Sequence, residues 1–546
     1  MAAEHTLLPM TWADAGYMAP ELILLAMMAL LIIVDLVLPR RFDRAVIGWL
    51  SLASLLGSAA SLVWRLVERN STDGGEQAKQ TISILHDSYR MDDFGSMLKL
   101  LLLAATALIV LWSLGAMKQG ASERVAHLGE YYYLLLPAAA GAMIMVSTGD
   151  LVTLYVGLEL LSMSTYILVG LRSRSALTAQ SAAFASAASS DGTGAQTYSA
   201  KPAEAAFKYV VTGGISSALI LFGMSYIYGL TGSTNIGEIA FGLLQVKASF
   251  EELLIVAFFF LLAGFGIKIA AAPFHAWAPD VYDGAPTPIS ALLAVVTKTA
   301  AVAALLRLFY NLVYSAGGVH GKIGTTMFRA VLVIAACAMV VGTVSALGQR
   351  NVKRLLALSG VANAGYLLVP IGLSFYGVHT NNAAELYFYA AAYLFMNIGA
   401  FAVVSIVGGT GERVIELRAF EGLYYRAPWT AGAMIALVLS LAGLPVSGGF
   451  FGKLFILFGA ASTHAYWLVA VMVATSVVSY AVYFGIVRQM FMRSSGSEAV
   501  KVPTATGAAI WLCTLATLAL GVYPNGLMEA FEHVFTLAGD LFVYMQ

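Results

Sequence analysis

The chain has 546 residues, of which 60% are hydrophobic and only 11% are charged, and its mean hydropathy is +0.81. This composition excludes a string of soluble domains and predicts a polytopic membrane protein. The 30 Lys and Arg residues balance the 30 Asp and Glu residues, so the chain lacks the basic field of a nucleic-acid-binding protein.

Apolar stretches long enough to cross a bilayer, about 20 residues each, occur along the whole chain. The first is preceded by polar residues, without a basic segment or a small-residue cleavage site, so we expect a permanent helix rather than a signal peptide. The predicted spans are residues 19–38, 45–66, 92–116, 131–148, 150–171, 205–230, 251–272, 286–311, 326–347, 352–372, 384–408, 428–462, 465–491 and 504–523. The expected fold class is therefore all-α, with about 14 membrane-spanning helices.

Lys and Arg gather in alternate connections between the predicted spans. These basic connections are residues 40–44, 118–124, 172–201, 350–354, 413–426 and 488–501. Basic connections stay on the cytoplasmic side of the membrane. With an even number of spans, this pattern predicts that both termini lie on the outer side.

Three polar segments lie between or beyond the spans. Residues 68–91 are mixed in charge, and residues 173–203 are rich in Ala, Ser and Gly and predict a flexible cytoplasmic loop. We assign no chemistry to either segment. The segment after residue 524 mixes apolar and acidic positions, which fits either a short interfacial helix or a frayed end.

Several ionisable residues stand inside the apolar spans. A charge at the centre of a bilayer costs about 2.5 to 3.5 kcal/mol unless it is paired or hydrated. Any one of them alone fits a lysine that reaches the membrane surface, or a structural ion pair. Taken together, they predict a titratable series inside a polar interior. The residues are Glu159, Lys208, Lys268, Lys298 and Lys453.

Glycine and proline surround two of these lysines. Lys268 lies between two glycines and Pro273, and Lys453 follows Pro445 in a glycine-rich segment. Interrupted backbone at membrane depth is tolerated only where protein or water satisfies the freed polar groups. We therefore expect both spans, the seventh and the twelfth, to be broken helices. Kinks at glycine and proline are common in membrane helices. This would explain a single break easily, but it explains a matched pair of breaks poorly.

The matched breaks predict two related repeats of five helices, spans 4–8 and spans 9–13. Because five is odd, the repeats would insert in opposite orientations, with ion sites near the midplane of the membrane. The predicted domains are residues 1–130 for the N-terminal helices, 131–311 and 326–491 for the repeats, and 504–546 for the last helix and tail.

A lysine suits proton transfer in such an interior, because burial favours its neutral form and a nearby carboxylate favours its charged form. We predict that Glu159 and Lys268 form the switch, that Lys298 is the central relay, and that Lys453 is the exit or entry of the second half. This mechanism requires Glu159 beside Lys268 and a hydrated path that links the three lysines.

Other polar residues allow more than one interpretation. His275, just past the first break, fits either a proton relay near neutral pH or a cap of the broken helix. Asp280 and Asp283 fit a solvated turn and a helix cap. Lys99 fits a structural role, and Ser359 in the tenth span fits polar packing between helices.

Cysteine and nucleotide chemistry are not indicated. Cys337 and Cys513 stand alone in apolar runs, which excludes a disulfide framework and a CxxC metal or cluster site. No P-loop, GxGxxG, HExxH or GxSxG motif occurs in a suitable context. Any redox centre would therefore belong to a partner.

The segment FGIKIAAAPFHAWAPDVYDGAPTPISALLAVVTK, residues 265–298, resembles the signature of the antiporter-like subunits of respiratory complex I. Its PDVYDGAPTP form is most similar to the subunit N type, a relative of mitochondrial NADH dehydrogenase subunit 2. Similar stretches along nearly the whole chain are PELILL, MDDFGSMLKLLLL, LYVGLELLSMSTYIL, NVKRLLALSGVANAGYLL and GLPVSGGFFGKL. A lysine rather than a glutamate at position 453 argues against the subunit M type. The lack of a long lateral helix after the last span argues against the subunit L type.

The resemblance implies a role for each residue that matches the family pattern. Glu159 matches the glutamate of the fifth helix. Lys268, Lys298 and Lys453 match lysines of the seventh, eighth and twelfth helices. The 173–203 loop looks longer than in relatives, and Asn363 stands where relatives often carry histidine, which weakens a histidine relay through the tenth helix.

By the same resemblance, the chain would be a proton-translocating subunit of an NADH-quinone oxidoreductase in the bacterial inner membrane, beside other membrane-arm subunits. Partner subunits would pass electrons from NADH through FMN and iron-sulfur clusters to quinone, and this chain would hold no cofactor and no metal. One alternative is a stand-alone or multi-subunit cation/proton antiporter, and another is a purely structural membrane subunit. The residues do not identify the electron donor, since ferredoxin-oxidising systems use similar subunits.

Overall fold

A computed structural model gives the fold of the chain. It describes residues 12–39, 42–72, 82–117, 125–171, 201–246, 248–313, 316, 321–374, 381–408, 415–492 and 500–534. Most of the predicted loop at 173–203 and the end of the C-terminal tail lie outside the described residues.

The helices and strands of the described residues follow the apolar runs of the sequence. In the first half of the chain they are α1 (Trp12–Tyr17), α2 (Ala19–Val37), α3 (Ala45–Thr72), β1 (Ile82–Ile84), β2 (Tyr89–Met91), α4 (Asp93–Ala116), α5 (Leu128–Val146), α6 (Leu151–Val169), α8 (Lys201–Thr231), α9 (Ile236–Leu243), η2 (Ala248–Phe250) and α10 (Glu251–Ile269). In the second half they are α11 (Ala278–Gly284), α12 (Thr287–Leu308), η3 (Phe309–Val313), α14 (Lys322–Leu347), α15 (Val352–Leu373), α16 (Asn382–Val407), η4 (Leu417–Phe420), α17 (Leu423–Arg426), α18 (Pro428–Ala442), α19 (Gly448–Ser462), α20 (Tyr466–Phe491), α21 (Thr504–Val522) and α22 (Pro524–Val534).

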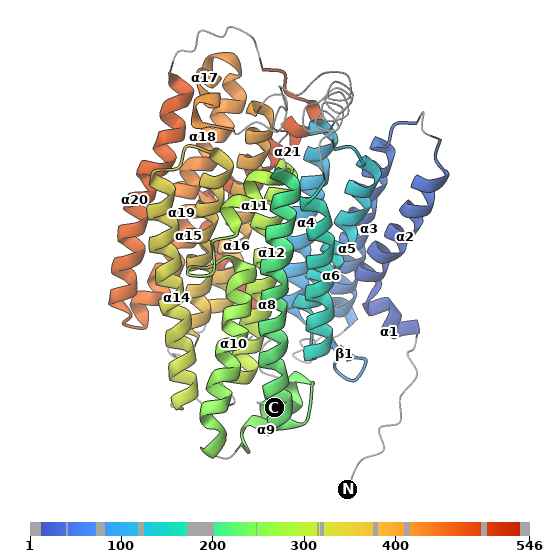
Figure 1. Ribbon diagram of the computed structural model, residues 1–546, viewed down its shortest axis with the longest axis vertical. Coiled ribbons are helices and arrows are strands. Elements are labelled where there is room, and N and C mark those ends of the chain that lie inside the picture. Colours follow the sequence, from blue (N-terminus) through green and yellow to red (C-terminus); the bar gives the residue numbers. More distant parts are fainter. Residues whose placement is uncertain are drawn as a thin grey trace, which may run out of the picture.

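The long helices run side by side along one axis and form a bundle (Figure 1). Among the described residues, 12 helices are long and apolar enough to cross a membrane, which confirms the polytopic all-α class. α5 has 19 residues, and α18 and α19 follow one another with 15 residues each. The total of about 14 spans stays a prediction. Counting α5 as one further span, and α18 together with α19 as another, would bring the 12 long helices to that total.

The centre of the bundle lies on α12 and α15. The most apolar stretches of these two helices are 100% buried inside the protein, whereas those of α2 and α20 are 22% and 28% buried. A helix that is apolar on every side needs cover on every side, so α12 and α15 are internal and α2 and α20 are left to face lipid. Lys298, on α12, therefore lies in the core of the protein.

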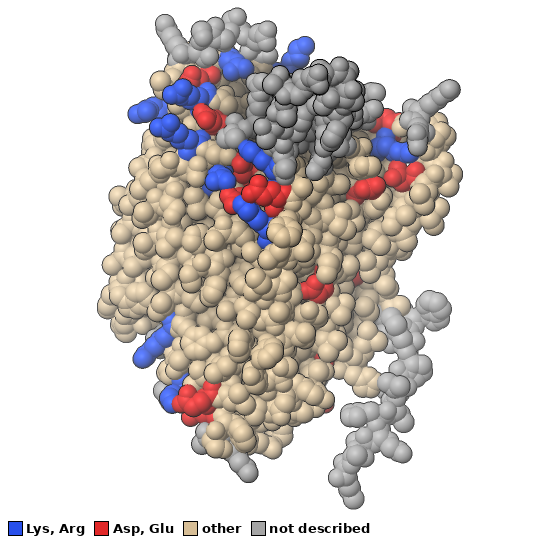
Figure 2. All heavy atoms as spheres, in the orientation of Figure 1, with Lys and Arg blue, Asp and Glu red and all other residues tan. Residues whose placement is uncertain are grey.

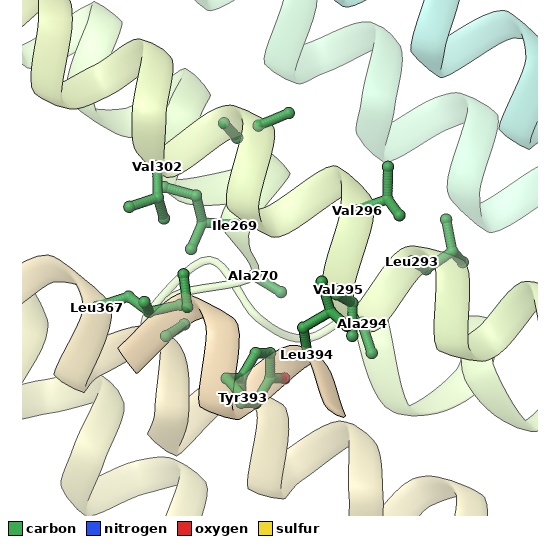
Figure 3. Packing of buried hydrophobic residues seen from close by; sticks show 14 of the residues in the cluster. Ile269, Ala270, Leu293, Ala294, Val295, Val296, Val302, Leu367, Tyr393 and Leu394 are labelled. Carbon is green, nitrogen blue, oxygen red and sulfur yellow. The ribbon is translucent and has the colours of Figure 1, made fainter. Parts of the chain in front are cut away.

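Both predicted breaks are present, at residues 270–277 between α10 and α11 and at residues 443–447 between α18 and α19. The residue that ends each first helix is left-handed: Ala270 has a φ of 58° and Gly443 a φ of 92°. A left-handed residue turns the chain out of a helix. Figure 3 shows Ala270 among the buried side chains of α12, α15 and α16, with Tyr393 close by.

Two small elements were not predicted from the sequence. β1 and β2 form an antiparallel hairpin in which Ile82 pairs with Met91, within the segment 68–91 that lacks a long apolar run. α9 has only eight residues, too few for a clear helical period. Both elements lie at the lower end of the bundle in Figure 1.

Charged side chains are concentrated at the ends of the molecule. On the face shown in Figure 2, most Lys and Arg side chains gather near the upper end, and the middle of the face is almost free of charge. A broad uncharged zone between two polar ends is what a bilayer requires of the surface that it covers. The arrangement agrees with a multi-pass membrane protein.

Candidate functional site

Lys268 lies in the last turn of α10, directly before the first break, and faces α6. Its ammonium donates a hydrogen bond to Ser162 Oγ at 2.7 Å, and the hydroxyl of Tyr166 lies at 3.5 Å. The ammonium also lies 5.8 Å from the centre of the Tyr166 ring, within the range of a cation–π contact. α6 therefore offers Lys268 neutral oxygen partners.

Glu159 stands on α6 about one turn before Ser162, on the same side of the helix. Its Oε1 atom is buried and has no hydrogen-bond partner among the described residues. Glu159 is close enough to interact electrostatically with Lys268, yet no ion pair within 4.0 Å joins these two described residues. The structure thus brings Lys268 within electrostatic reach of Glu159, while its hydrogen bond goes to Ser162. Their role as a switch stays a prediction.

Lys298 is completely buried on α12, with an exposed fraction of 0%. Within the described part of the chain, its Nζ atom has no hydrogen-bond partner, and neither have the hydroxyls of Tyr282 and Tyr393. The ammonium lies 6.0 Å from the centre of the Tyr282 ring. Buried polar groups without protein partners are normally satisfied by ordered water. The surroundings of Lys298 therefore favour a hydrated site.

A row of aromatic side chains connects Lys268 to Lys298. Tyr166 contacts Tyr209 edge to face at 4.8 Å between ring centres, and Tyr209 stacks on Trp277 at 5.0 Å. Trp277 in turn contacts Tyr282 at 6.4 Å. The row therefore consists of three tyrosines and one tryptophan, with Tyr166 beside Lys268 at one end and Tyr282 beside Lys298 at the other.

Lys453 lies on α19, directly after the second break. Its ammonium donates to the carbonyl oxygens of Leu441 at 2.8 Å and Ala442 at 3.4 Å. These carbonyls end α18, and the last carbonyls of a helix lack partners within the helix and carry negative partial charge. Lys453 therefore completes the broken helix and is held in the polar gap that the break creates. The carbonyl of Gly443 accepts a further bond from Tyr480 at 2.6 Å.

A network of neutral polar groups lies beside Lys453. The hydroxyl of Tyr389 donates to Asn363 Oδ1 at 2.6 Å. The Asn363 amide donates to the backbone oxygen of Ser359 at 3.0 Å, and the Ser359 hydroxyl contacts that of Tyr483. A cavity of about 10 Å³ adjoins this network, close to the space that one water molecule needs. Its polar lining residues are Thr343, Ser359, Asn363, Tyr366, Lys453, Thr475, Ser479 and Tyr483.

Among the described residues, no hydrogen bond or ion pair joins Lys208 or His275 to Lys268, Lys298 or Lys453. Lys208 is 40% exposed and forms ion pairs with Asp280 at 2.6 Å and Glu204 at 2.7 Å. His275 lies in the first break, and its Nδ1 atom is buried without a hydrogen-bond partner among the described residues. The structure therefore places Lys208 in a charged cluster near the end of the bundle, and leaves both interpretations of His275 open.

The structure changes the interpretation of two aspartates that were expected in a solvated turn. Asp280 and Asp283 lie on α11, neither caps that helix, and Asp283 is only 11% exposed. Both form ion pairs with residues of other helices.

The structural role expected for Lys99 agrees with its buried ion pair to Glu21 at 2.6 Å.

The tyrosines are the polar groups that the sequence analysis missed. Tyrosine counts as largely apolar in a hydropathy profile, and the direction of its hydroxyl depends on packing between helices. A clue was present in the spacing of Tyr389 and Tyr393 on the same side of α16.

In the part of the chain that the structure describes, no group of three or more His, Cys, Asp or Glu residues could hold a metal ion.

Comparison with known proteins adds independent observations. Residues 193–479 match the family described as NADH:quinone oxidoreductase/Mrp antiporter, TM. NADH-quinone oxidoreductase subunit N of Paenibacillus sp. (strain JDR-2) is 56% identical over 542 residues, which cover 98% of this chain and 99% of that relative.

Solved structures show the same fold. A chain of respiratory complex I from Thermus thermophilus, solved with bound aureothin, is 29% identical, with a TM-score of 0.72 over 94% of this chain and 99% of that chain. A chain of the Mrp complex from Dietzia sp. DQ12-45-1b is 19% identical, with a TM-score of 0.76 over 98% of each chain. The second likeness concerns the fold alone.

Proposed function

The chain belongs to the subunit N family of NADH-quinone oxidoreductases, and from this premise we propose that it translocates protons through Glu159, Lys268, Lys298 and Lys453. It is a membrane subunit of the complex I type rather than a stand-alone antiporter. One observation carries the proposal: three lysines lie in the interior of the bundle, and two of them stand at helix breaks. The third, Lys298, is fully buried, and its ammonium has no hydrogen-bond partner among the described residues. Ionisable residues in such places are costly and are normally functional.

The first half of the site supports a switch with two positions. In the position described, the Lys268 ammonium is held by the neutral Ser162 and Tyr166. A small displacement toward Glu159 would pair the charges and favour the protonated lysine, and the return would favour release of the proton. Each transfer converts an ammonium to a neutral amine while the acceptor gains the proton and the charge.

The second half supports a relay from Lys298 to Lys453. The proton would leave the Lys298 ammonium through water beside Tyr393 and pass through the hydroxyl and amide groups around Asn363. Lys453 would receive it while its nitrogen is held by the Leu441 and Ala442 carbonyls. Because a helix C-terminus favours a positive charge, this position suits the charged form of Lys453. In this scheme, hydroxyl groups take the place of a histidine relay in the tenth helix.

The two inverted repeats, residues 131–311 and 326–491, are part of the proposal. A matched pair of contacts supports them: Asp150, which caps α6, bridges to Asn235, and Asn351, which caps α15, bridges to Glu416. These two caps lie at opposite ends of the bundle in Figure 1. We propose that both termini lie on the outer side, because the basic connections alternate along the chain and the predicted number of spans is even. The Lys and Arg side chains that gather near the upper end of the face in Figure 2 support one basic side of the membrane.

We further propose that this chain works in a bacterial inner membrane beside other membrane-arm subunits. NADH, FMN, the iron-sulfur clusters and quinone would be bound by partner subunits, and this chain would bind none of them. The names of the relative and of the Thermus complex support this assignment. We take NADH as the electron donor from the name of the family.

A substitution tests the proton-transfer role. We expect Lys268→Ala, in the assembled complex in inverted membrane vesicles, to lower the number of protons translocated per quinone reduced. A lysine that only fills space would leave this ratio intact. A normal ratio in an assembled Lys268→Ala complex would overturn the proposed mechanism.

A purification tests the assembly and the electron donor. The tagged chain is purified gently from native membranes, and quinone reduction is assayed with NADH and with reduced ferredoxin. We expect co-purified iron-sulfur subunits and NADH-dependent quinone reduction. A chain that purifies alone, or only with other membrane subunits and without redox activity, would favour the antiporter alternative.

A further inference from the structure

α11 is a short helix that must be held in place by its neighbours. It has seven residues, Ala278–Gly284, and no side-chain cap at its N-terminus. A helix of this length is not stable without tertiary contacts. α11 directly follows the first break, so its position also determines the course of the chain after Lys268. The contacts that fix α11 are therefore relevant to the proposed site.

The first turn of α15 holds α11 from one side through three side chains. Asn351 donates from Nδ2 to Asp283 Oδ1 at 2.6 Å. Lys353 donates to the carbonyl oxygen of Ala285, the residue that follows α11, at 2.7 Å. The guanidinium of Arg354 pairs with Asp280 Oδ1 at 2.5 Å. α15 belongs to the second of the proposed repeats, so these contacts cross from one half of the molecule to the other.

α8 holds α11 from the other side. Lys208 pairs with the second oxygen of Asp280, Oδ2, at 2.6 Å, and Lys201 lies 3.4 Å from Asp283 Oδ2. The backbones also pack closely, because a Cβ atom on Gly284 would lie 2.7 Å from the carbonyl oxygen of Lys201. Each aspartate of α11 is thus shared between a cation of the first half and a donor of the second half.

α11 and the residue before it contribute groups to the surroundings of Lys298 and Lys268. The ring of Tyr282, on α11, faces the ammonium of Lys298 at 6.0 Å. Trp277, directly before α11, donates from Nε1 to the Ile267 carbonyl at 2.9 Å, beside Lys268. α15 approaches Lys298 from another side at Gly360. A displacement of α11 relative to α15 would therefore change the surroundings of both Lys268 and Lys298.

We propose that Asp280 and Asp283, with Lys201, Lys208, Asn351 and Arg354, form an α11 clamp that positions the first break and Lys298 relative to the second half. These are positioning residues, because they act through α11 and α15 and not by contact with the transferred proton. Asp280, Lys208 and Arg354 are about one-third exposed or more, and ion pairs of this kind contribute little to stability. The clamp thus acts by holding α11 in position. Its loss affects the alignment of the two halves more than the stability of the fold. This inference rests on the proposed function.

The test measures proton translocation and quinone reduction in inverted vesicles that contain the full complex. Arg354→Gln and Asp283→Ala remove cross-half contacts, and Arg354→Lys retains a cation opposite Asp280. Glu252→Gln is the matched control, because Glu252 pairs with Lys322 at 2.9 Å between α10 and α14 and both side chains are more than 60% exposed. Lys298→Ala is measured in parallel to test the proposed function itself.

We expect Arg354→Gln and Asp283→Ala to lower the number of protons translocated per quinone reduced by about twofold or more. A change of about twofold is the smallest effect expected of residues that couple two sites. The content of this chain in the complex should stay normal, Arg354→Lys should recover most of the ratio, and Glu252→Gln should match the unchanged protein. If Asp283→Ala prevents assembly, Asp283→Asn replaces it, because it keeps an acceptor for Asn351 but removes the charge that Lys201 and Arg354 face.

Three outcomes would overturn the clamp. An unchanged ratio in Arg354→Gln and the Asp283 variant would show that α11 needs no such positioning. A lower chain content with an unchanged ratio per complex would show a purely structural role, and an equal fall in Glu252→Gln would show that no specific contact is involved. If Lys298→Ala translocates normally, the proposed function fails; if only the clamp variants are normal, the clamp alone fails.

Discussion

The ammonium of Lys298 lies 2.8 Å from the point that a Cβ atom on Gly360 would occupy. Lys298 is on α12 and Gly360 is on α15. Because Gly360 has no side chain, α15 leaves room for the ammonium of Lys298. The hydroxyl of Tyr393 lies 3.0 Å from the same point. Gly360 therefore sets the space in which Lys298 meets its polar neighbours.

The first prediction follows from this contact. Gly360→Ala should lower proton translocation per quinone reduced, because the methyl group displaces the flexible end of Lys298 from its place beside Tyr393. The fold should persist, since the atoms that must move are the ends of side chains. Gly214→Ala is the control, because no atom of a neighbouring described residue lies within 4 Å of the Cβ atom that it would add. Equal translocation by the two variants would contradict the assigned position of Lys298.

A second prediction concerns the contact of Lys268 with Ser162 Oγ at 2.7 Å. Ser162→Ala removes this neutral partner and leaves only the weaker contact with the Tyr166 hydroxyl at 3.5 Å to oppose the attraction of Glu159. A hydrogen bond to a charged group contributes about 1.5 to 3 kcal/mol, so the shift toward Glu159 should slow proton release by about tenfold. Stopped-flow proton translocation in vesicles measures this rate. A variant as fast as the unchanged protein would show that Ser162 is not one position of the switch.

A third prediction tests the hydroxyl network of the second half. Tyr389→Phe removes the donor to Asn363 Oδ1 at 2.6 Å and interrupts the proposed path between Lys298 and Lys453. Proton translocation per quinone reduced should fall. Tyr387→Phe is the matched control on the same helix, because its hydroxyl contacts the Met97 carbonyl on α4 at 3.3 Å. The proposed path would be wrong if both variants retained the full ratio.

A fourth prediction concerns stability. Lys99 and Glu21 form an ion pair at 2.6 Å in which each side chain is 1% exposed, and Tyr89 donates to both Glu21 oxygens at 3.0 Å. Lys99→Ala leaves the Glu21 carboxylate buried without its cation, which should destabilise the protein by about 3 to 5 kcal/mol. Thermal inactivation of the purified complex in detergent measures the loss. The double variant Lys99→Met with Glu21→Leu should regain much of the stability, and a single variant as stable as the unchanged protein would contradict this role.

The spans and the buried lysines were predictable from the sequence for one reason. A bilayer requires long apolar runs and makes every charge within them costly, so both features are visible in one chain without its fold. The same reasoning predicted the breaks, because Pro273 and Pro445 cannot continue a helix. Lys268, Lys298 and Lys453 were therefore found from local sequence.

Contacts between distant segments were not predictable in this way. The partners of Asp280 and Asp283 come from residues 201–208 and 351–354, and a lone sequence does not show which helices become neighbours. The direction of the Tyr389 and Tyr393 hydroxyls likewise depends on the packing of α16 against α12 and α15. Sequence reasoning thus identified the charges, and only the fold identified the groups that lie between them.

The most direct test of the central claim is the number of protons translocated per quinone reduced by the complex that carries Lys298→Ala. Both quantities are measured in the same inverted vesicles, and Lys322→Ala, which removes a lysine that is 63% exposed, is the control. The account predicts a lower ratio for Lys298→Ala and an unchanged ratio for Lys322→Ala, with normal amounts of this chain in both complexes. An unchanged ratio in an assembled Lys298→Ala complex would contradict the claim that the buried lysines carry the protons.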